Sequence, residues 1–376
     1  MENSSPSELN RRSFLKQGGA LAAATLAGAA LTTNSLAQDA ATEGNKPMLR
    51  VAMLSGWHPH ARGYAKSFAD TPGVKLTAVW DEVPERGQKW AQELEVPFVA
   101  DLKEVIARED VDGVAVNAPT NRHEEIMVGA ANAGKHIFTE KVMALTVDEC
   151  KRIAEAVRKA DVKFCISFPF RTKPETLYAR KAVEEGLLGT LTFFRVRVAH
   201  DGVSGKWLPE HFYDPVSCGG GAMIDLGAHP MYLARWLGGQ PRKFSSTFNS
   251  VIAEGIEDNA VTVVEFENKC IGVAETSFVS TASPFSLEMS GTEGSLFVGG
   301  PDEKQVLIRS KKLDAREWQT PELPAALPTP IQMWVDGIVK GTPIPFGLEE
   351  GIQLTEMMEY AYRSFREGKQ VEIAKA

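Results

Sequence analysis

The fold is decided by the stretch MLRVAMLSGWHPHARGYAKSF, which runs from Met48 to Phe68. An apolar run at 49–54 predicts a strand that enters a turn and continues into a helix. At such a turn a dinucleotide-binding loop usually reads G-x-G-x-x-G. Here the loop reads S-G-W-H-P-H, and Gly56 is its single glycine.

Three interpretations of this loop are open. His58 and His60 ligate a metal together with His123 or an acid elsewhere, the loop has lost its cofactor, or it holds a dinucleotide in an altered way. H-x-H spacing alone is a weak metal signal, whereas the start of a helix suits a phosphate even without glycines. We therefore favour an altered dinucleotide loop without a metal. Its expected cofactor contacts are Ser55, Gly56, Trp57, His58 and His60.

Short apolar runs alternate with helical patterns from residue 48 to about 165. This rhythm predicts a parallel sheet covered by helices on both faces, which is a doubly wound Rossmann domain over 48–166. Such a sheet binds its ligand at the carboxyl ends of the strands. The predicted strands cover 49–54, 74–80, 112–119, 135–140 and 162–168.

The second half of the chain has a different rhythm. Strand patterns follow one another closely from residue 191 to 310 and predict a large, open, mostly antiparallel sheet. We assign 167–330 to this second α/β domain. Residues 331–376 read as helices that pack back on the core, so the fold class is α/β throughout.

The first 37 residues have the order of a twin-arginine export signal. Arg11 and Arg12 precede a short alanine-rich apolar run, and small residues at Ser35 and Ala37 mark a cleavage site. A disordered N-terminus is the weaker alternative. We therefore expect an exported, periplasmic protein.

Composition narrows the range of partners. The formal net charge is −8, which argues against nucleic acid and anionic membranes. No segment after the signal is apolar enough to span a bilayer. None of the four cysteines has C-x-x-C spacing, and we expect buried free thiols. The expected partners are a small-molecule substrate and further copies of the chain.

The strongest chemical signal is GGGAMIDLGAHPMYLARWL, residues 219–237. Three glycines open a backbone that another group must approach closely. Asp225 and His229 lie four residues apart, on one face of a predicted helix. A carboxylate that orients an imidazole is a common acid–base arrangement. The structural alternative is a helix with a polar face and a core histidine.

Glu140 and Lys141 form the second signal, at the carboxyl end of the strand 135–140. A lysine at this position stabilises a developing alkoxide or binds a ribose hydroxyl. An exposed charged pair that enters a loop is an equal alternative.

Two other strand ends carry polar residues. Asp81 is placed to accept the ribose 2′-hydroxyl of NAD and would repel the 2′-phosphate of NADP, although a helix N-cap explains it equally well. The third strand leads into four expected cofactor contacts, Asn117, Pro119, Asn121 and His123.

Together these motifs resemble the Gfo/Idh/MocA oxidoreductases. The resemblance covers nearly the whole mature chain, including the closing segment at 343–373. It implies a Rossmann domain, an α/β domain with an open sheet, and NAD as cofactor, with NADP as the alternative. It also implies a catalytic set that falls on Lys141, Asp225 and His229.

The chain departs from this family pattern after the lysine. The family usually has a proline there, often in a cis bond, whereas this chain has Val142, for which a cis bond is costly. We therefore expect Lys141 to be aimed differently. Arg171 is a candidate substrate contact by resemblance, and His211 and Tyr213 are weaker ones because ordinary loop packing explains them equally well.

The sequence thus predicts an oxidoreductase that acts on a hydroxyl of a sugar, glycoside or cyclitol. In this hypothesis His229 takes the hydroxyl proton, Asp225 orients His229, and Lys141 stabilises the oxyanion. Export implies a tightly bound cofactor that is reset in each cycle. Two alternatives remain: a redox-cofactor-dependent glycoside hydrolase or lyase, and a non-catalytic sugar- or nucleotide-binding protein.

Overall fold

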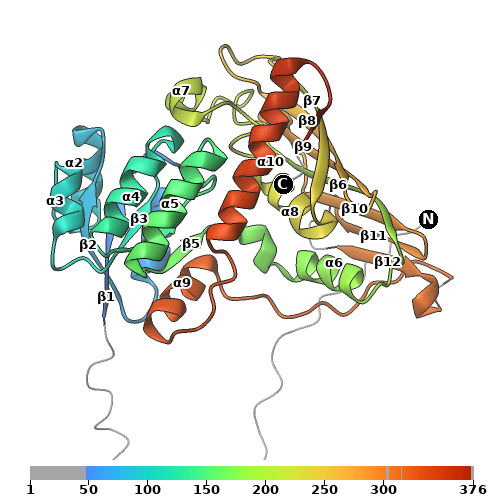
Figure 1. The fold of residues 1–376 in the computed structure, drawn as a ribbon, viewed down its shortest axis with the longest axis horizontal. Coiled ribbons are helices and arrows are strands. Elements are labelled where there is room, and N and C mark those ends of the chain that lie inside the picture. Colours follow the sequence, from blue (N-terminus) through green and yellow to red (C-terminus); the bar gives the residue numbers. More distant parts are fainter. Residues whose placement is uncertain (1–47, 302–304, 315, 374–376) are drawn as a thin grey trace, which may run out of the picture. The chain divides into compact units, whose positions relative to one another are not determined.

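The computed structural model describes residues 48–301, 305–314 and 316–373. The predicted export signal at 1–37 lies outside these residues. A five-stranded parallel sheet comes first, in the order β2-β1-β3-β4-β5 (Figure 1). Its strands are β1 (Leu49–Leu54), β2 (Val74–Trp80), β3 (Gly113–Val116), β4 (His136–Thr139) and β5 (Phe164–Ile166).

Helices connect these strands, as the alternating rhythm predicts. Where the sequence supplies a cap, the helix begins at it: the Thr146 hydroxyl accepts the Glu149 N–H, and the Glu149 carboxylate accepts the Thr146 N–H in return. The connecting helices are α1 (Ala61–Ala69), α2 (Pro84–Glu93), α3 (Leu102–Ala107), η1 (Thr120–Arg122), α4 (His123–Asn132) and α5 (Val147–Ala160).

An eight-stranded sheet follows, in the order β12-β11-β10-β6-β9-β8-β7-β13. All of its pairs are antiparallel except β6 with β9, which confirms a mostly antiparallel second sheet. Its strands are β6 (Leu191–Ala199), β7 (Pro241–Asn249), β8 (Asn259–Phe266), β9 (Ile271–Ser277), β10 (Ser286–Gly291), β11 (Gly294–Gly299), β12 (Val306–Ser310) and β13 (Val371–Glu372).

Side chains alternate between the two faces of this sheet. Along β8 every second residue is buried, so one face packs on helices and the other faces solvent. The elements around the sheet are η2 (Pro169–Thr172), α6 (Pro174–Glu184), η3 (Glu210–Tyr213), α7 (Pro215–Cys218), α8 (Ala228–Gly238) and η4 (Lys311–Leu313).

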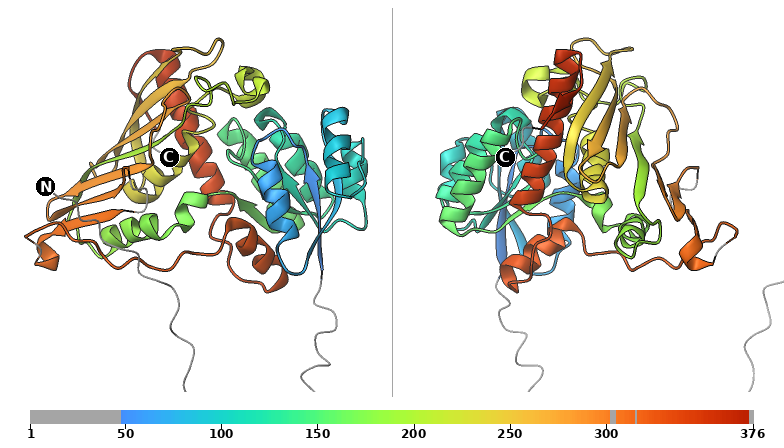
Figure 2. Two further views of the ribbon diagram at one scale, coloured as in Figure 1. Left: turned by 180° about the vertical axis from the view of Figure 1, so that it is seen from behind. Right: turned by 45° about the vertical axis from the view of Figure 1, so that its right-hand side comes forward.

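Two C-terminal helices return to earlier parts of the chain. Helix α9 (Pro330–Val339) packs on β4 and β5, and its Trp334 joins an aromatic cluster with Phe68 and Phe138. Helix α10 (Leu348–Glu367) contacts α5 and β5 as well as α8 and β7, as Figures 1 and 2 show. The C-terminal segment therefore contacts both sheets.

The structure also bears on the cysteines and on membrane-spanning helices. All four cysteines are buried free thiols, as predicted. Among the described residues, no helix is long and apolar enough to cross a membrane.

Candidate active site

Lys141 and Asp225 form the centre of the site. Lys141 follows β4, and Asp225 lies in the turn before α8. The Lys141 Nζ lies 2.5 Å from Asp225 Oδ1 and 2.8 Å from the Asp225 carbonyl oxygen. The lysine side chain is 2% exposed and the aspartate side chain 18%. Burial alone would raise the pKa of Asp225, but the Lys141 ammonium and the His58 contact hold it well below its ordinary value.

His229 has a different partner from the one predicted. Helix α8 begins at Ala228, so Asp225 is not on the same helix face as His229. The His229 Nδ1 lies 3.1 Å from the Tyr232 hydroxyl, whereas the Asp225 carboxylate contacts Lys141 and His58. The prediction that Asp225 orients His229 is therefore wrong, and Tyr232 takes that role.

Tyr232 and His229 share one hydrogen bond. The phenol oxygen accepts the Phe170 backbone N–H at 3.1 Å, and it either donates its own proton to His229 Nδ1 or accepts the Nδ1 proton. His229 Nε2 carries no proton only in the second of these tautomers, and the ring can then act as a base. Burial holds the pKa of His229 well below its ordinary value, and Lys141 lowers it further, so the ring is neutral near pH 7.

Other residues of the same chain lie close to the glycine run at 219–221. A Cβ at Gly220 would lie 2.1 Å from the Tyr362 hydroxyl, and a Cβ at Gly221 would lie 2.1 Å from the Glu257 carbonyl oxygen. The Glu257 carboxylate also accepts the N–H groups of Gly221 and Met223. The close approach inferred from the sequence is real, but it fixes the turn that carries Asp225 and leaves no room there for a ligand.

The S-G-W-H-P-H loop uses its backbone donors internally. Ser55 takes the left-handed conformation, with φ of 71°, that usually favours glycine. The Gly56 N–H donates to Asp81 Oδ2, the Trp57 N–H to the Ser55 hydroxyl, and the His58 N–H to the Asn117 carbonyl oxygen. These bonds take the place of contacts that a glycine-rich loop offers to phosphate.

A segment of the second half of the chain covers the loop. The Trp57 ring stacks on Phe212 with centroids 4.9 Å apart, and His211 Nε2 donates to the Trp57 carbonyl oxygen at 2.8 Å. Tyr213 packs on the same apolar cluster. His211, predicted to contact substrate, is therefore committed to the loop. We call the group formed by Trp57, His211 and Phe212 the tryptophan clasp.

The two loop histidines lie beside Glu140. The His60 Nδ1 is 3.2 Å from Glu140 Oε2, which also accepts the Tyr64 hydroxyl. Burial alone would lower the pKa of His60, but the Glu140 carboxylate raises it above its ordinary value. Burial would raise the pKa of Glu140, but His58, His60 and Lys141 hold it below its ordinary value.

His58, His60 and Glu140 each have one potential ligand atom within 4.8 Å of the others. His58 does not suit a metal, because its Nδ1 accepts the His60 backbone N–H at 3.1 Å. Its Nε2 therefore carries the proton and faces Asp225 Oδ1 at 3.4 Å. With neither ring nitrogen free for a cation, the geometry is that of a hydrogen-bond network.

Asp81 does not present a free carboxylate. Its side chain is 0% exposed. Its oxygens accept the N–H groups of Gly56 and Val83 at 2.8 Å each and a two-pronged ion pair from Arg86. The prediction of a free 2′-hydroxyl acceptor is wrong for this conformation, and Arg86 neutralises the charge that was expected to repel NADP.

Of the four residues predicted after β3, three are buried and one is exposed. Asn117 is fully buried, Pro119 is buried in the turn, and Asn121 is exposed in η1. The His123 ring lies 3.0 Å from the carbonyl oxygens of both Ala118 and Val142, and burial lowers its pKa. His123 thus links the turns after β3 and β4 and is not open to a ligand.

Residues 52–168 match the model of an oxidoreductase family with an NAD-binding Rossmann fold, and residues 176–297 match a GFO/IDH/MocA C-terminal domain. The chain belongs to the Gfo/Idh/MocA oxidoreductases. The resemblance drawn from the motifs is thereby confirmed, together with the α/β fold class.

Named relatives give the breadth of this family. The chain is 28% identical to scyllo-inositol 2-dehydrogenase (NAD(+)) of Bacillus subtilis over 84% of this chain and 92% of the relative. It is 27% identical to levoglucosan dehydrogenase of Pseudarthrobacter phenanthrenivorans over 59% and 64%. GenD2 from gentamicin A biosynthesis, solved with NAD, aligns with a TM-score of 0.75 at 25% identity over 88% and 97%.

The Gfo/Idh/MocA site has polar groups that suit a nicotinamide dinucleotide. Asn117 Oδ1, at the carboxyl end of β3, is buried and has no hydrogen-bond partner among the described residues. Such an acceptor calls for a donor from a ligand. The His60 side chain is 48% exposed at the start of α1, where an anion is favoured. Asn117, His60 and Lys141 are therefore residues that could hold a cofactor.

Val142 stands where the family usually has a proline after the lysine. The Lys141–Val142 peptide bond is cis, although the residue is not proline. The bond is thus cis despite the cost expected for Val142, and the different aim of Lys141 stays a prediction.

The sequence did not single out several residues that shape this site. Tyr64 donates to Glu140 and lies 2.8 Å from the Ser167 hydroxyl, and Tyr232 orients His229. His200, at the end of β6, stacks on Phe278. Each comes from an element whose pattern reads as ordinary packing.

Arg171 lies apart from the Lys141–Asp225 pair. Its guanidinium is 4.9 Å from the Trp236 ring centre, in a separate cavity. The structure does not place it among the residues at the Lys141–Asp225 centre, where substrate was predicted.

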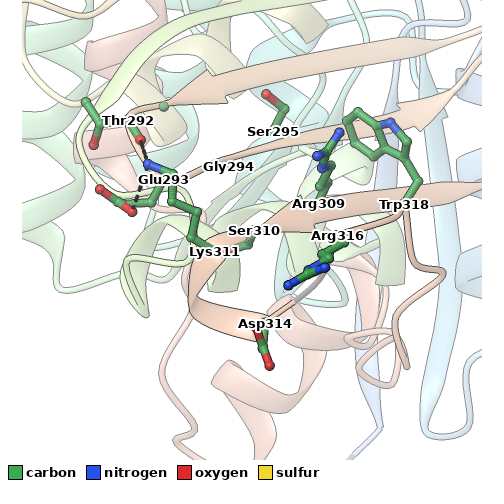
Figure 3. A pocket seen from close by; sticks show the side chains of 11 residues that line it. Thr292, Glu293, Gly294, Ser295, Arg309, Ser310, Lys311, Asp314, Arg316 and Trp318 are labelled. Carbon is green, nitrogen blue, oxygen red and sulfur yellow. Dashed lines mark hydrogen bonds and ion pairs between the residues drawn. The ribbon is translucent and has the colours of Figure 1, made fainter.

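A pocket of about 560 Å³, larger than the cavity that contains Arg171, lies at the β10–β11 hairpin (Figure 3). Lys311 pairs there with Glu293, and Trp318 packs edge-on against Phe297. This pocket contains none of the predicted site residues.

Proposed function

We propose that this chain is an NAD(P)-dependent oxidoreductase that acts on a hydroxyl of a sugar, glycoside or cyclitol. The observation that carries the proposal is the Lys141–Asp225 pair beside neutral, buried His229, at the carboxyl edge of the family's Rossmann sheet. The inositol and levoglucosan dehydrogenases among its relatives support the substrate class.

Each residue then has a defined task. His229 Nε2 accepts the hydroxyl proton, in the tautomer whose Nδ1 proton points to the Tyr232 hydroxyl. The Lys141 ammonium stabilises the oxygen as it gains negative charge, and Asp225 holds that ammonium in place. When bound, the nicotinamide cofactor accepts a hydride from the carbon that bears the hydroxyl.

We further propose that the cofactor stays bound through successive cycles. An export signal at 1–37 would deliver the folded protein to a compartment without an NAD pool. The tryptophan clasp supports retention, because it joins the altered loop to the second half of the chain through a stacked ring pair and a hydrogen bond. A second sugar would then reset the cofactor by accepting its hydride, or the oxidised intermediate would take the hydride back after losing its glycosidic substituent.

The solvent face of the second sheet supports self-association. Large apolar side chains are 36–43% exposed on four of its strands, a pattern typical of a protein interface. We propose a homo-oligomer formed through this face, which light scattering of the purified protein would test. The residues are Phe193, Val261, Val263, Ile271 and Phe297.

The activity is tested by mixing the purified protein with inositols, levoglucosan and simple aldoses under single-turnover conditions. We expect reduced nicotinamide to form with at least one of them, and His229→Ala to abolish this. His136→Gln is the matched control, because His136 opens β4 and only accepts the Lys163 N–H. Full turnover in a folded His229→Ala variant would refute the assignment. A cleaved glycoside with no net oxidation would instead support the hydrolase alternative.

A further inference from the structure

A second cavity, partly open to solvent, lies beside Tyr232. It has a volume of about 250 Å³ and is lined by residues of η2, α6, α8 and α10. Tyr232, whose hydroxyl contacts His229, forms part of its wall. Three guanidinium groups line this cavity, from Arg171, Arg180 and Arg235, against the single carboxylate of Glu350. We call it the arginine cavity.

The Arg171 guanidinium has no hydrogen-bonded partner in the described part of the chain. It forms no hydrogen bond or ion pair there, and its Nε is fully buried. Its guanidinium lies between Trp236 and Phe346, 4.9 and 5.0 Å from the two ring centres. Burial lowers the pKa of this group to about 10, so it stays charged near neutral pH. An unpaired buried charge is costly unless another group balances it.

The other arginines do not balance this charge. Arg235 donates to the Gly239 carbonyl oxygen and to Gln240, both neutral, and its Nε is also buried without a partner. Arg180 pairs with Glu184. Arg180 is thus balanced by a carboxylate, whereas Arg235, like Arg171, forms no ion pair among the described residues.

Glu350 offsets only part of this excess. Its Oε2 accepts the Gly347 N–H at 3.0 Å at the start of α10. No ion pair joins Glu350 to any of the three arginines among the described residues. With Arg180 balanced by Glu184, the two remaining guanidinium groups face one carboxylate, so the lining keeps an excess of one positive group.

We propose that the arginine cavity binds a small oxyanion, the phosphate or carboxylate group of a small molecule. Guanidinium groups hold both anions through paired N–H donors. The volume of about 250 Å³ has room for such a group and a short substituent. This inference does not depend on the proposed dehydrogenase function, because none of the three arginines belongs to the Lys141–Asp225 centre.

Thermal unfolding in the presence of inorganic phosphate tests the proposal, with chloride at the same ionic strength as reference. Phosphate should raise the Tm of the wild type along a saturable curve, because it binds the folded state only. Acetate in a parallel series separates a carboxylate site from a phosphate site. Stabilisation by phosphate alone indicates a phosphate site, and stabilisation by acetate alone indicates a carboxylate site. Stabilisation by both indicates a general oxyanion site.

Arg171→Met keeps an unbranched side chain next to the two rings and removes its charge. We expect at least a tenfold loss of phosphate affinity, together with a Tm in chloride no lower than that of the wild type, because the unpaired charge is gone. Arg235→Met should also weaken binding, and it keeps the test valid if Arg171→Met does not fold. Arg152→Met is the control, since Arg152 is exposed and pairs with Glu124. Equal, unsaturable shifts in all four proteins would overturn the proposal.

Discussion

Replacing Lys141 by methionine tests the ion pair at the centre of the site. The variant leaves the Asp225 carboxylate, 18% exposed, with His58 at 3.4 Å as its remaining partner. At the observed 2.5 Å, Coulomb's law with an effective dielectric of about 20 gives a gross attraction of roughly 7 kcal/mol. Desolvation of the two groups offsets much of this.

The net effect should still be large. Removing one partner of a buried pair typically costs about 3–5 kcal/mol. We expect a loss of about 3 kcal/mol in the free energy of unfolding, at the lower end because Asp225 keeps some solvent contact. Turnover should fall by about 10²–10³-fold, as for the loss of an oxyanion-stabilising group.

Chemical denaturation near neutral pH, followed by circular dichroism, measures the loss. Lys151→Met is the control, because Lys151 is 66% exposed and its pair with Asp148 should contribute little. The double variant Lys141→Met with Asp225→Asn should recover part of the lost stability, since it also removes the unpaired carboxylate. A Lys141→Met variant within about 1 kcal/mol of the wild type, without recovery in the double variant, would refute this reasoning.

Three further predictions follow from the same geometry. The pKa of every histidine except His60 lies below its ordinary value because the ring is buried. The unfolded state therefore binds more protons below about pH 6.5, and Tm should fall by about 5 °C or more from pH 7.5 to 5. His60 has the opposite sign, with stability lost as pH rises, and a flat Tm would contradict this balance. Tyr232→Phe should lower kcat by about tenfold to a hundredfold, less than the loss of a general base, with KM nearly unchanged; a change in KM alone would assign Tyr232 to binding. Trp57→Ala should open the tryptophan clasp, so that the purified protein holds less dinucleotide per chain than the wild type, and an unchanged ratio would show that the clasp does not retain it.

The sequence predicts the scaffold well because its signals are local. Continuous apolar runs between helical patterns define β1 to β5, and alternation defines the second sheet. The carboxyl end of a parallel strand places Lys141 at the ligand edge of the sheet, and the family resemblance implies that Lys141 meets the glycine-rich segment there.

The partners of the catalytic side chains were harder to predict. The Asp225–His229 pairing required α8 to begin at Asp225, but the turn fixed by Glu257 and Tyr362 delays the helix to Ala228. Glu257 is 36 residues from Gly221, and no local pattern links them. Tyr232 lies in an apolar helix and reads as core.

The partners of Asp81 were equally hard to predict from the sequence. Its position at the end of β2 was predicted correctly, but Arg86 neutralises it and the Gly56 N–H binds it. Position follows from the strand pattern, whereas availability to a ligand depends on tertiary contacts that spacing does not encode.

The most direct test of the account is the dinucleotide content of the purified protein. The chain would be expressed with residues 1–37, the proposed export signal, intact. It would then be purified and denatured, and the supernatant would be analysed by mass spectrometry. The account predicts close to one NAD(H) or NADP(H) per chain. No dinucleotide, even after incubation with excess NAD and NADP, would contradict it and leave a non-catalytic binding protein as the better description.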